Sequence, residues 1–215
     1  MLFSLGMQKF MSLLSSAIIQ HVIALRDRGL ASVAYFYFDF RNIDKKNQRS
    51  LLSSLLLQLS SRSRPRLDIL SRLYSTHNSG KEEPSEHSLV QCLKDMVVAR
   101  SDLPTFIIMD AIDECPNILG IPTPREQVLE LVKALVDFGF PNLRICVTSR
   151  PEIDIRAVLE LLAPGHLSLH DQPGQKRDID VYVSGIVQSD RKMRRWREDD
   201  RRLVIATLSE KADGM

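Results

Sequence analysis

The chain has 215 residues, of which 44% are hydrophobic and 26% charged, and its formal net charge is +2. This composition is typical of an ordinary soluble chain with one sizeable core and a small appendage, and so small a charge requires no polyanionic partner. No run reaches the roughly 18 to 20 apolar residues that a membrane-spanning helix needs. Three cysteines without metal-ligand spacing favour a reducing compartment, so we expect a cytoplasmic protein that does not bind membranes.

The N-terminal half alternates helix-type and strand-type patterns. Apolar residues at helical spacing from Leu13 to Leu25 predict a helix that ends at Gly29, although a targeting segment at the N-terminus is an alternative. Residues 31–38 are rich in aromatic and branched side chains and predict a strand. Leucine periodicity predicts a helix over 47–61, and Ser85 is a suitable N-cap for a helix that runs to about Arg100. We expect the basic, serine-rich segment 60–66 and the polar segment 76–84 to be surface loops.

Two further predicted strands end in polar side chains. Residues 104–109 form an apolar run that stops at Asp110, and two more carboxylates follow at Asp113 and Glu114. Residues 143–147 form another apolar run, followed by Thr148, Ser149 and Arg150. A helix predicted from Pro124 to about Gly139 separates the two strands. A strand, helix and strand in succession predict a right-handed parallel connection, so both polar ends should lie at the same edge of one sheet.

Ligands of open α/β sheets bind at this edge. Carboxylates can hold a magnesium ion and an arginine can form paired hydrogen bonds with a phosphate, so the two strand ends together suggest a nucleoside triphosphate site. Simpler interpretations exist for each part. A carboxylate after a strand often caps the next helix, and an Arg-Pro pair such as Arg150-Pro151 is often only a turn.

The run Phe106–Cys115 (FIIMDAIDEC), followed further along by Val147–Pro151 (VTSRP), resembles the Walker B and sensor segments of NACHT-domain proteins. These belong to the STAND class of signalling P-loop NTPases, and the chain is most similar to the nephrocystin-type N-terminal module of fungal multidomain proteins. The resemblance covers about Ser12 to Tyr182. It implies an α/β fold, with a three-layer P-loop NTPase core and a mainly parallel sheet over residues 1–172. Residues 173–215 would be the start of a helical subdomain.

The resemblance also implies roles for single residues, with Mg²⁺ and ATP or GTP as cofactors. Asp110 would bind the magnesium through water, and Asp113 or Glu114 would orient or deprotonate the attacking water. Thr148 and Arg150 would sense the terminal phosphate. Alignment with the first helix of the family places Ser12 at the hydroxyl that binds magnesium.

The chain departs from the family at the phosphate loop. The motif G-x-x-x-x-G-K-[ST], whose backbone N–H groups wrap the phosphates and whose lysine neutralises them, occurs nowhere in the sequence. The same alignment puts Met11 at the lysine and Phe10 at the preceding glycine. We therefore expect a fragment of a NACHT-type switch, truncated at both ends, with weak or absent nucleotide binding and hydrolysis. The alternative is a nucleotide-inactive interaction module that associates with itself or with intact NACHT proteins.

The C-terminal region is less regular. Helices are predicted over 152–162, 176–187 and 201–211, and an alternating pattern predicts a strand over 166–170. Residues 191–197 are the most basic run and contain the only tryptophan, Trp196. Nucleic acid or an acidic membrane could bind such a run, with Trp196 stacking on a base. Because three acidic residues follow at 198–200, we favour a solvated connecting segment and consider nucleic acid an unlikely partner.

Overall fold

A computed structural model describes the backbone of residues 4–42, 47–118, 120–162 and 175–211, and the side chains of 15–42, 47–118, 120–162 and 180–208. The chain divides into two compact units. One is Phe10–Ala163, and the other combines Met1–Lys9 with Pro164–Met215. The predicted division at residue 172 stays a prediction.

A three-stranded parallel sheet lies in the first unit. Its strands are β1 (Ser32–Tyr37), β2 (Thr105–Asp110) and β3 (Leu143–Val147), in the order β1-β2-β3. Tyr37 is level with Asp110, and Met109 is level with Val147, so the carboxyl ends of all three strands reach the same edge. The strands predicted at 31–38, 104–109 and 143–147, their parallel direction and the α/β class are confirmed, whereas a P-loop NTPase core stays a prediction.

Several helices of this unit begin or end at capping residues. Helix α1 (Ser4–Asp27) is followed by Gly29, whose φ of +74° reverses the chain. Asn47 caps α2 (Gln48–Ser60) by accepting from Ser50 N at 2.9 Å, and Ser85 caps α4 (Glu86–Val98) by accepting from Ser88 N at 3.1 Å. Helix α5 (Pro124–Asp137) starts in a capping box and precedes α6 (Ile153–Leu162).

The surface loop predicted over residues 60–66 is confirmed only for a short connection between helices in which Ser61 and Arg62 are exposed. Helix α3 (Arg64–Thr76) starts inside this segment, and the side chain of Arg66 is buried. Its guanidinium donates to Met96 O at 2.7 Å, Ser32 Oγ at 2.7 Å and Thr105 Oγ1 at 2.9 Å. Composition suggested a loop because arginine and serine are usually exposed, but three distant acceptors in the fold make burial of this arginine possible.

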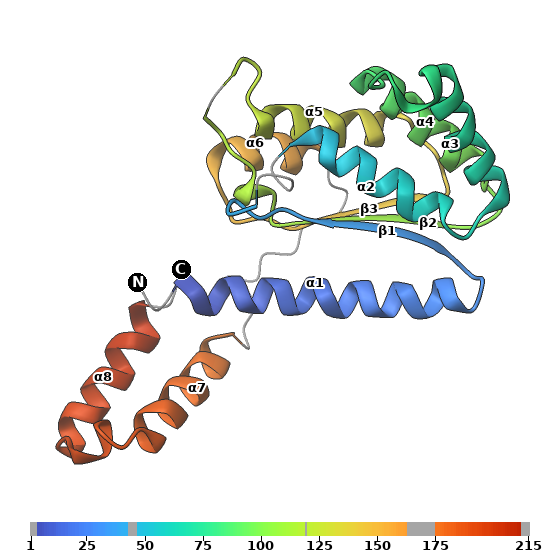
Figure 1. Ribbon diagram of the computed structural model, residues 1–215. Coiled ribbons are helices and arrows are strands. Elements are labelled where there is room, and N and C mark those ends of the chain that lie inside the picture. The colour runs from blue at the N-terminus through green and yellow to red at the C-terminus, as the bar shows by residue number, and fades with distance from the viewer. Residues whose placement is uncertain (1–3, 43–46, 119, 163–174, 212–215) are drawn as a thin grey trace. The chain divides into compact units, whose positions relative to one another are not determined.

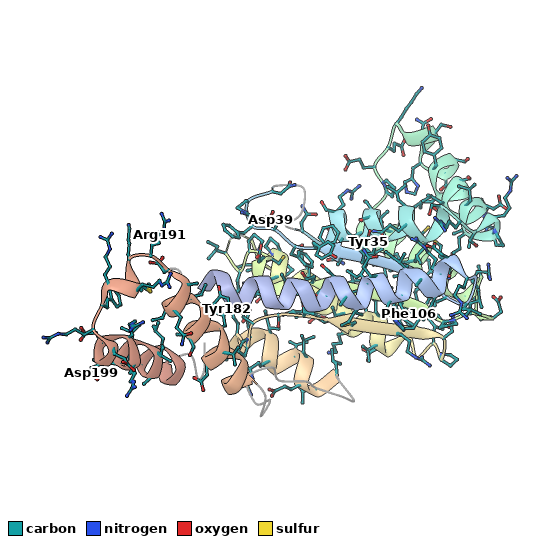
Figure 2. All side chains as sticks on the ribbon, turned by 90° about the horizontal axis from the view of Figure 1, so that it is seen from below. Tyr35, Asp39, Phe106, Tyr182, Arg191 and Asp199 are labelled. Carbon is teal, nitrogen blue, oxygen red and sulfur yellow. The ribbon has the colours of Figure 1, made fainter. Side chains whose placement is uncertain are left out.

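Helices cover both faces of the sheet in Phe10–Ala163 (Figure 1), because side chains alternate along each strand. Ile107 and Met109 join the larger core cluster, to which α2, α4, α5 and α6 contribute apolar side chains. Ile108 points to the other face and packs with Ile19 and Val22 of α1. Tyr35 and Phe106 pack on this second cluster, beside α1 (Figure 2). The sheet is therefore enclosed between two helical layers.

The side chain of Gln58 is hydrogen-bonded to the outer edge of β1 at Tyr35. The Gln58 amide accepts from Tyr35 N at 3.1 Å and donates to Tyr35 O at 2.7 Å, so it replaces the backbone of a further strand. Such capping protects an edge strand from pairing with another chain.

The second unit contains a pair of helices in contact, α7 (Gln175–Ser189) and α8 (Glu198–Lys211), with a 3-10 turn, η4 (Met193–Arg195), between them. Both predicted helices are confirmed, and α8 starts earlier than expected, within the acidic run. The strand predicted at 166–170 lies outside the described residues. Among the described helices, none is sufficiently long and apolar to cross a membrane.

Candidate functional site

Asp110 ends β2 at the carboxyl edge of the sheet and is 3% exposed. Its Oδ1 accepts hydrogen bonds from two hydroxyl groups. Ser15 Oγ donates from the buried face of α1, and Thr148 Oγ1 donates at 2.5 Å from the residue after β3. One carboxylate oxygen therefore joins α1 to the ends of two neighbouring strands.

Thr148 holds the turn that follows β2. Its N–H donates to Met109 O at 3.0 Å, and its carbonyl accepts from Ile112 N at 3.1 Å. Its hydroxyl also accepts from Ala111 N at 3.1 Å. Ala111 has a φ of +59°, in the left-handed region that a residue with a Cβ rarely adopts. The hydrogen bonds from Thr148 to both sides of Ala111 stabilise this conformation.

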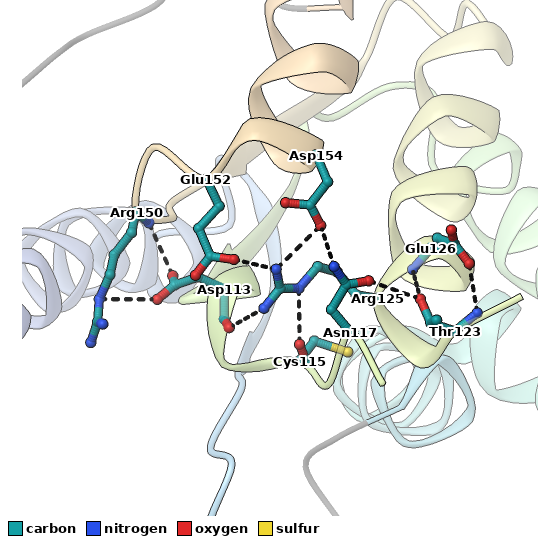
Figure 3. Close-up of polar contacts among 9 residues, drawn as sticks. All are labelled: Asp113, Cys115, Asn117, Thr123, Arg125, Glu126, Arg150, Glu152 and Asp154. Atoms are coloured by element: carbon teal, nitrogen blue, oxygen red, sulfur yellow. Dashed lines mark hydrogen bonds and ion pairs between the residues drawn. The ribbon is translucent and has the colours of Figure 1, made fainter. Parts of the chain in front are cut away.

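The acidic turn itself is η3 (Ile112–Glu114), and its carboxylates face different partners. Asp113 Oδ1 accepts from Arg150 N at 3.0 Å, and its Oδ2 lies 3.2 Å from Arg150 Nε (Figure 3). The Asp113 side chain is 6% exposed, whereas Arg150 is about half exposed. Glu114 Oε2 accepts from Phe40 N at 3.3 Å, which links the turn to the segment after β1.

Arg125 is a central residue of this region that the sequence analysis missed. Its buried guanidinium donates to one backbone carbonyl of the acidic turn, from Nη2 to Asp113 O at 2.6 Å, and to the carbonyl of the residue that follows the turn, from Nε to Cys115 O at 2.9 Å (Figure 3). Its Nη1 donates to Glu152 Oε2 and, at 3.2 Å, to Asp154 Oδ2. Burial works to lower the pKa of Arg125, but hydrogen bonds and charges of the two carboxylates outweigh it and raise the pKa.

A signal for Arg125 did exist in the sequence. The residue lies in the first turn of α5, where the helix dipole disfavours a cation. A buried arginine there needs carboxylate or carbonyl partners, and these come from residues that are distant in sequence. Nearby, Asn117 Nδ2 donates to Asp154 Oδ2 at 3.1 Å, so the loop before α5 is also tied to the start of α6 (Figure 3).

The predicted site residues are only partly brought together. Asp110 meets Thr148, and Asp113 meets Arg150, as two separate contacts. The side chain of Ser12 is outside the described residues. The hydroxyl of α1 that reaches Asp110 is that of Ser15, about one helical turn further along. Whether any of these residues has the predicted catalytic, sensing or metal-binding role stays a prediction.

The backbone around Phe10–Ser12 does not form a phosphate loop in the structure. Helix α1 runs from Ser4 to Asp27 and includes Phe10–Ser12, where the family alignment places the end of the phosphate loop. Backbone N–H groups in a helix interior donate to carbonyls of the preceding turn, so they are not available to wrap phosphates. In the described part of the chain, no group of three or more His, Cys, Asp or Glu residues is arranged to hold a metal ion.

Together these features define an α/β domain with a helix-covered parallel sheet and a polar cluster at the carboxyl ends of its strands. A family model described as "Nephrocystin 3, N-terminal" matches residues 11–150, more than half of the chain. The chain therefore belongs to the nephrocystin 3 N-terminal family. No curated protein and no solved structure matches it significantly.

Proposed function

We propose that this chain is a NACHT-type module that works without nucleotide and acts by binding other proteins. The side chains at the carboxyl edge of the sheet then stabilise the folded domain and do not bind a ligand. The observation that carries the proposal is that Asp110 Oδ1 accepts two hydrogen bonds, one from Ser15 and one from Thr148. Ser15 belongs to helix α1, which is continuous through the residues where the family has its phosphate loop. The module would associate with itself or with intact NACHT proteins.

The charges at the edge support a structural role. Asp113 is paired with Arg150, and Glu152 and Asp154 are paired with Arg125. These pairs bridge the acidic turn, α5 and the start of α6. They stabilise the acidic turn in one conformation. In a nucleotide-dependent switch, the bound nucleotide would stabilise this turn instead.

Exposed apolar side chains beside this edge support the binding of a protein. Ile118 and Ile121 precede α5 and are 75% and 104% exposed, and Ile153 at the start of α6 is 89% exposed. The hydrogen bond from Asn117 to Asp154 ties the two segments together. Exposed apolar residues mark an interaction site where they form a contiguous patch, and we propose that these three do so.

Thermal unfolding with MgATP, with MgGTP and with EDTA tests the nucleotide part of the proposal. A ligand at a hundredfold excess over its dissociation constant would stabilise the fold by about 2.7 kcal/mol. We expect no shift in melting temperature with either nucleotide. We also expect Asp110→Ala to lower the melting temperature by the same amount in all three conditions, because the lost contacts are internal.

Sedimentation over a range of concentrations tests self-association. Ile153→Ser should weaken it, whereas Leu161→Ser is the matched control, since Leu161 is similarly exposed at 87% and lies near the other end of α6. If the wild-type chain is monomeric at all concentrations, the self-association part of the proposal is wrong.

A nucleotide-dependent switch is the second candidate. It is favoured by the position of Asp110, Asp113 and Arg150 at the carboxyl ends of adjacent parallel strands, where α/β proteins bind nucleotides. In that case a nucleotide would stabilise the wild-type chain, and Asp110→Ala would abolish the shift.

A further inference from the structure

The turn between α7 and α8 presents a cluster of cations. Arg191, Lys192, Arg194, Arg195 and Arg197 are all exposed. The structure records no ion pair for any of the five with another described residue. They contrast with many exposed arginines of the Phe10–Ala163 unit, such as Arg41, Arg62 and Arg156, which are paired with carboxylates.

The turn has a defined conformation. Asp190 Oδ1 accepts from Lys192 N at 2.7 Å and from Met193 N at 3.1 Å, and these backbone hydrogen bonds lower the pKa of Asp190. Arg194 N donates to Asp190 O at 3.0 Å, and Trp196 N donates to Met193 O at 3.1 Å. The cations therefore project from an ordered 3-10 turn, so little backbone entropy is lost when they bind a ligand.

The three acidic residues that follow in the sequence belong to the next helix. Glu198, Asp199 and Asp200 form the first turn of α8, where they interact favourably with the positive end of the helix dipole. Glu198 Oε1 also pairs with Arg202 Nη2 at 2.5 Å. Figure 2 shows Arg191 and Asp199 on different sides of the helix pair. Among the described residues, none of these three carboxylates forms an ion pair with the five cations of the turn.

Trp196 adds an aromatic surface to the cluster. Its side chain is 43% exposed and lies between Arg195 and Arg197 in the chain. Cations that follow a phosphate backbone, combined with an aromatic ring on which a base can stack, are the features of single-strand binding. We propose that the turn formed by residues 190–197 binds single-stranded nucleic acid, with the five cations on the phosphates and Trp196 on a base. Among residues 190–197 Trp196 is the only large apolar side chain that is exposed, so the turn itself offers a stacking surface and not a broad apolar face.

The test is a titration of the full chain with fluorescent 20-mers of uridine and of thymidine at several salt concentrations. The turn variant is Arg194→Gln/Arg195→Gln/Arg197→Gln. The matched control is Arg41→Gln/Arg62→Gln/Arg156→Gln, which removes the same charge from exposed, paired arginines elsewhere. Circular dichroism checks that both variants are folded.

We expect the turn variant to bind at least about tenfold more weakly and to flatten the slope of log affinity against log salt by about 2. The control should retain most of the affinity and the slope. Trp196→Ala should weaken binding of the better 20-mer about tenfold, while leaving binding of inorganic polyphosphate, which has no bases, unchanged. Uridine and thymidine arms distinguish RNA from DNA as the preferred strand.

Three results would overturn the proposal. The wild-type chain could fail to bind either 20-mer at low salt, or both triple variants could lose affinity equally, which would indicate only a general charge effect. The chain could also bind vesicles with phosphatidylserine while binding no oligonucleotide, which would assign the turn to a membrane surface.

Discussion

Thr148 lies next to Asp110 across the β2–β3 pair, and its hydroxyl donates to Asp110 Oδ1 at 2.5 Å while it accepts from Ala111 N at 3.1 Å. One hydroxyl group therefore satisfies a buried carboxylate and also holds the left-handed residue that follows it. With Ser15 on the same carboxylate oxygen, the end of β2 is fixed from two directions.

Replacing Thr148 by valine should destabilise the fold. Valine keeps the shape but removes the hydroxyl, so Asp110 loses a donor and Ala111 N loses its acceptor. An unsatisfied buried polar group costs about 1–3 kcal/mol, and we expect a loss of this size in the free energy of unfolding measured with urea. Thr148→Ser, which keeps the hydroxyl, should lose less. Equal stability of Thr148→Val and wild type would mean that the hydroxyl does not hold the turn.

Arg125→Gln should loosen the connection between the acidic turn and α6. The substitution removes contacts with two carbonyls and two carboxylates, so we expect a loss of about 2–4 kcal/mol in unfolding free energy. Arg156→Gln is the control. Its exposed pair with Glu160 on α6 should contribute less than about 0.5 kcal/mol. Similar losses for the two variants would contradict the central position of Arg125.

Arg66 and Arg64 allow a comparison within one turn of α3. Burial, followed by the charge of Arg100, lowers the pKa of Arg66 to about 10, and no carboxylate is hydrogen-bonded to its guanidinium among the described contacts. Arg66→Gln should lower the melting temperature strongly, because Met96 O, Ser32 Oγ and Thr105 Oγ1 would lose their donor. Arg64 is exposed and lies 3.8 Å from Asp68, so Arg64→Gln should have little effect. A larger loss in melting temperature for Arg64→Gln than for Arg66→Gln would contradict the burial of Arg66.

Two buried thiols predict a loss of stability at alkaline pH. Burial raises the pKa of Cys92 to about 11 and that of Cys115 to about 12, from 9.0. Below pH 9 both thiols are protonated in the folded and unfolded chains, so their contribution to the free energy of unfolding is fully present. As the pH rises further, only the unfolded chain releases these protons, and the contribution is progressively lost up to the folded pKa.

Urea unfolding at pH 8 and pH 10 measures this effect. Between the two values, the wild-type chain should lose about 1 kcal/mol per thiol more than the Cys92→Ala/Cys115→Ala variant. The comparison uses the change with pH, so the packing lost in the variant at both pH values does not affect it. An identical pH dependence of the two proteins would contradict burial of the thiols.

Most of the regular elements were predictable because they carry a local signal, whereas helix α3 was missed. The apolar run of β2 ends at Asp110, and caps such as Asn47 and Ser85 mark the helix starts. Parallel strand direction followed from the helix between β2 and β3. These signals depend on a few neighbouring residues, which a single sequence displays directly.

Contacts between distant residues were not predictable in the same way. Arg66 and Arg125 are buried because carbonyls and hydroxyls from other elements meet them, and nothing adjacent in the chain reveals those partners. The family alignment gave Ser12 a role in magnesium binding, which stays a prediction, and no local signal indicated that Ser15 of α1 would donate to Asp110. The position of Glu198, Asp199 and Asp200 in a first helical turn likewise depends on where α8 begins.

The most direct measurement is a double-mutant cycle between Ser15→Ala and Asp110→Ala, with unfolding free energies determined by urea in the absence and presence of MgATP or MgGTP. If the contact between Ser15 and Asp110 stabilises the fold, the losses of unfolding free energy in the two single variants should be coupled by at least about 1 kcal/mol. Neither nucleotide should then change the unfolding free energy of any variant. Additive losses, together with stabilisation of the wild-type chain by either nucleotide, would contradict the account and make a nucleotide-dependent switch the better description.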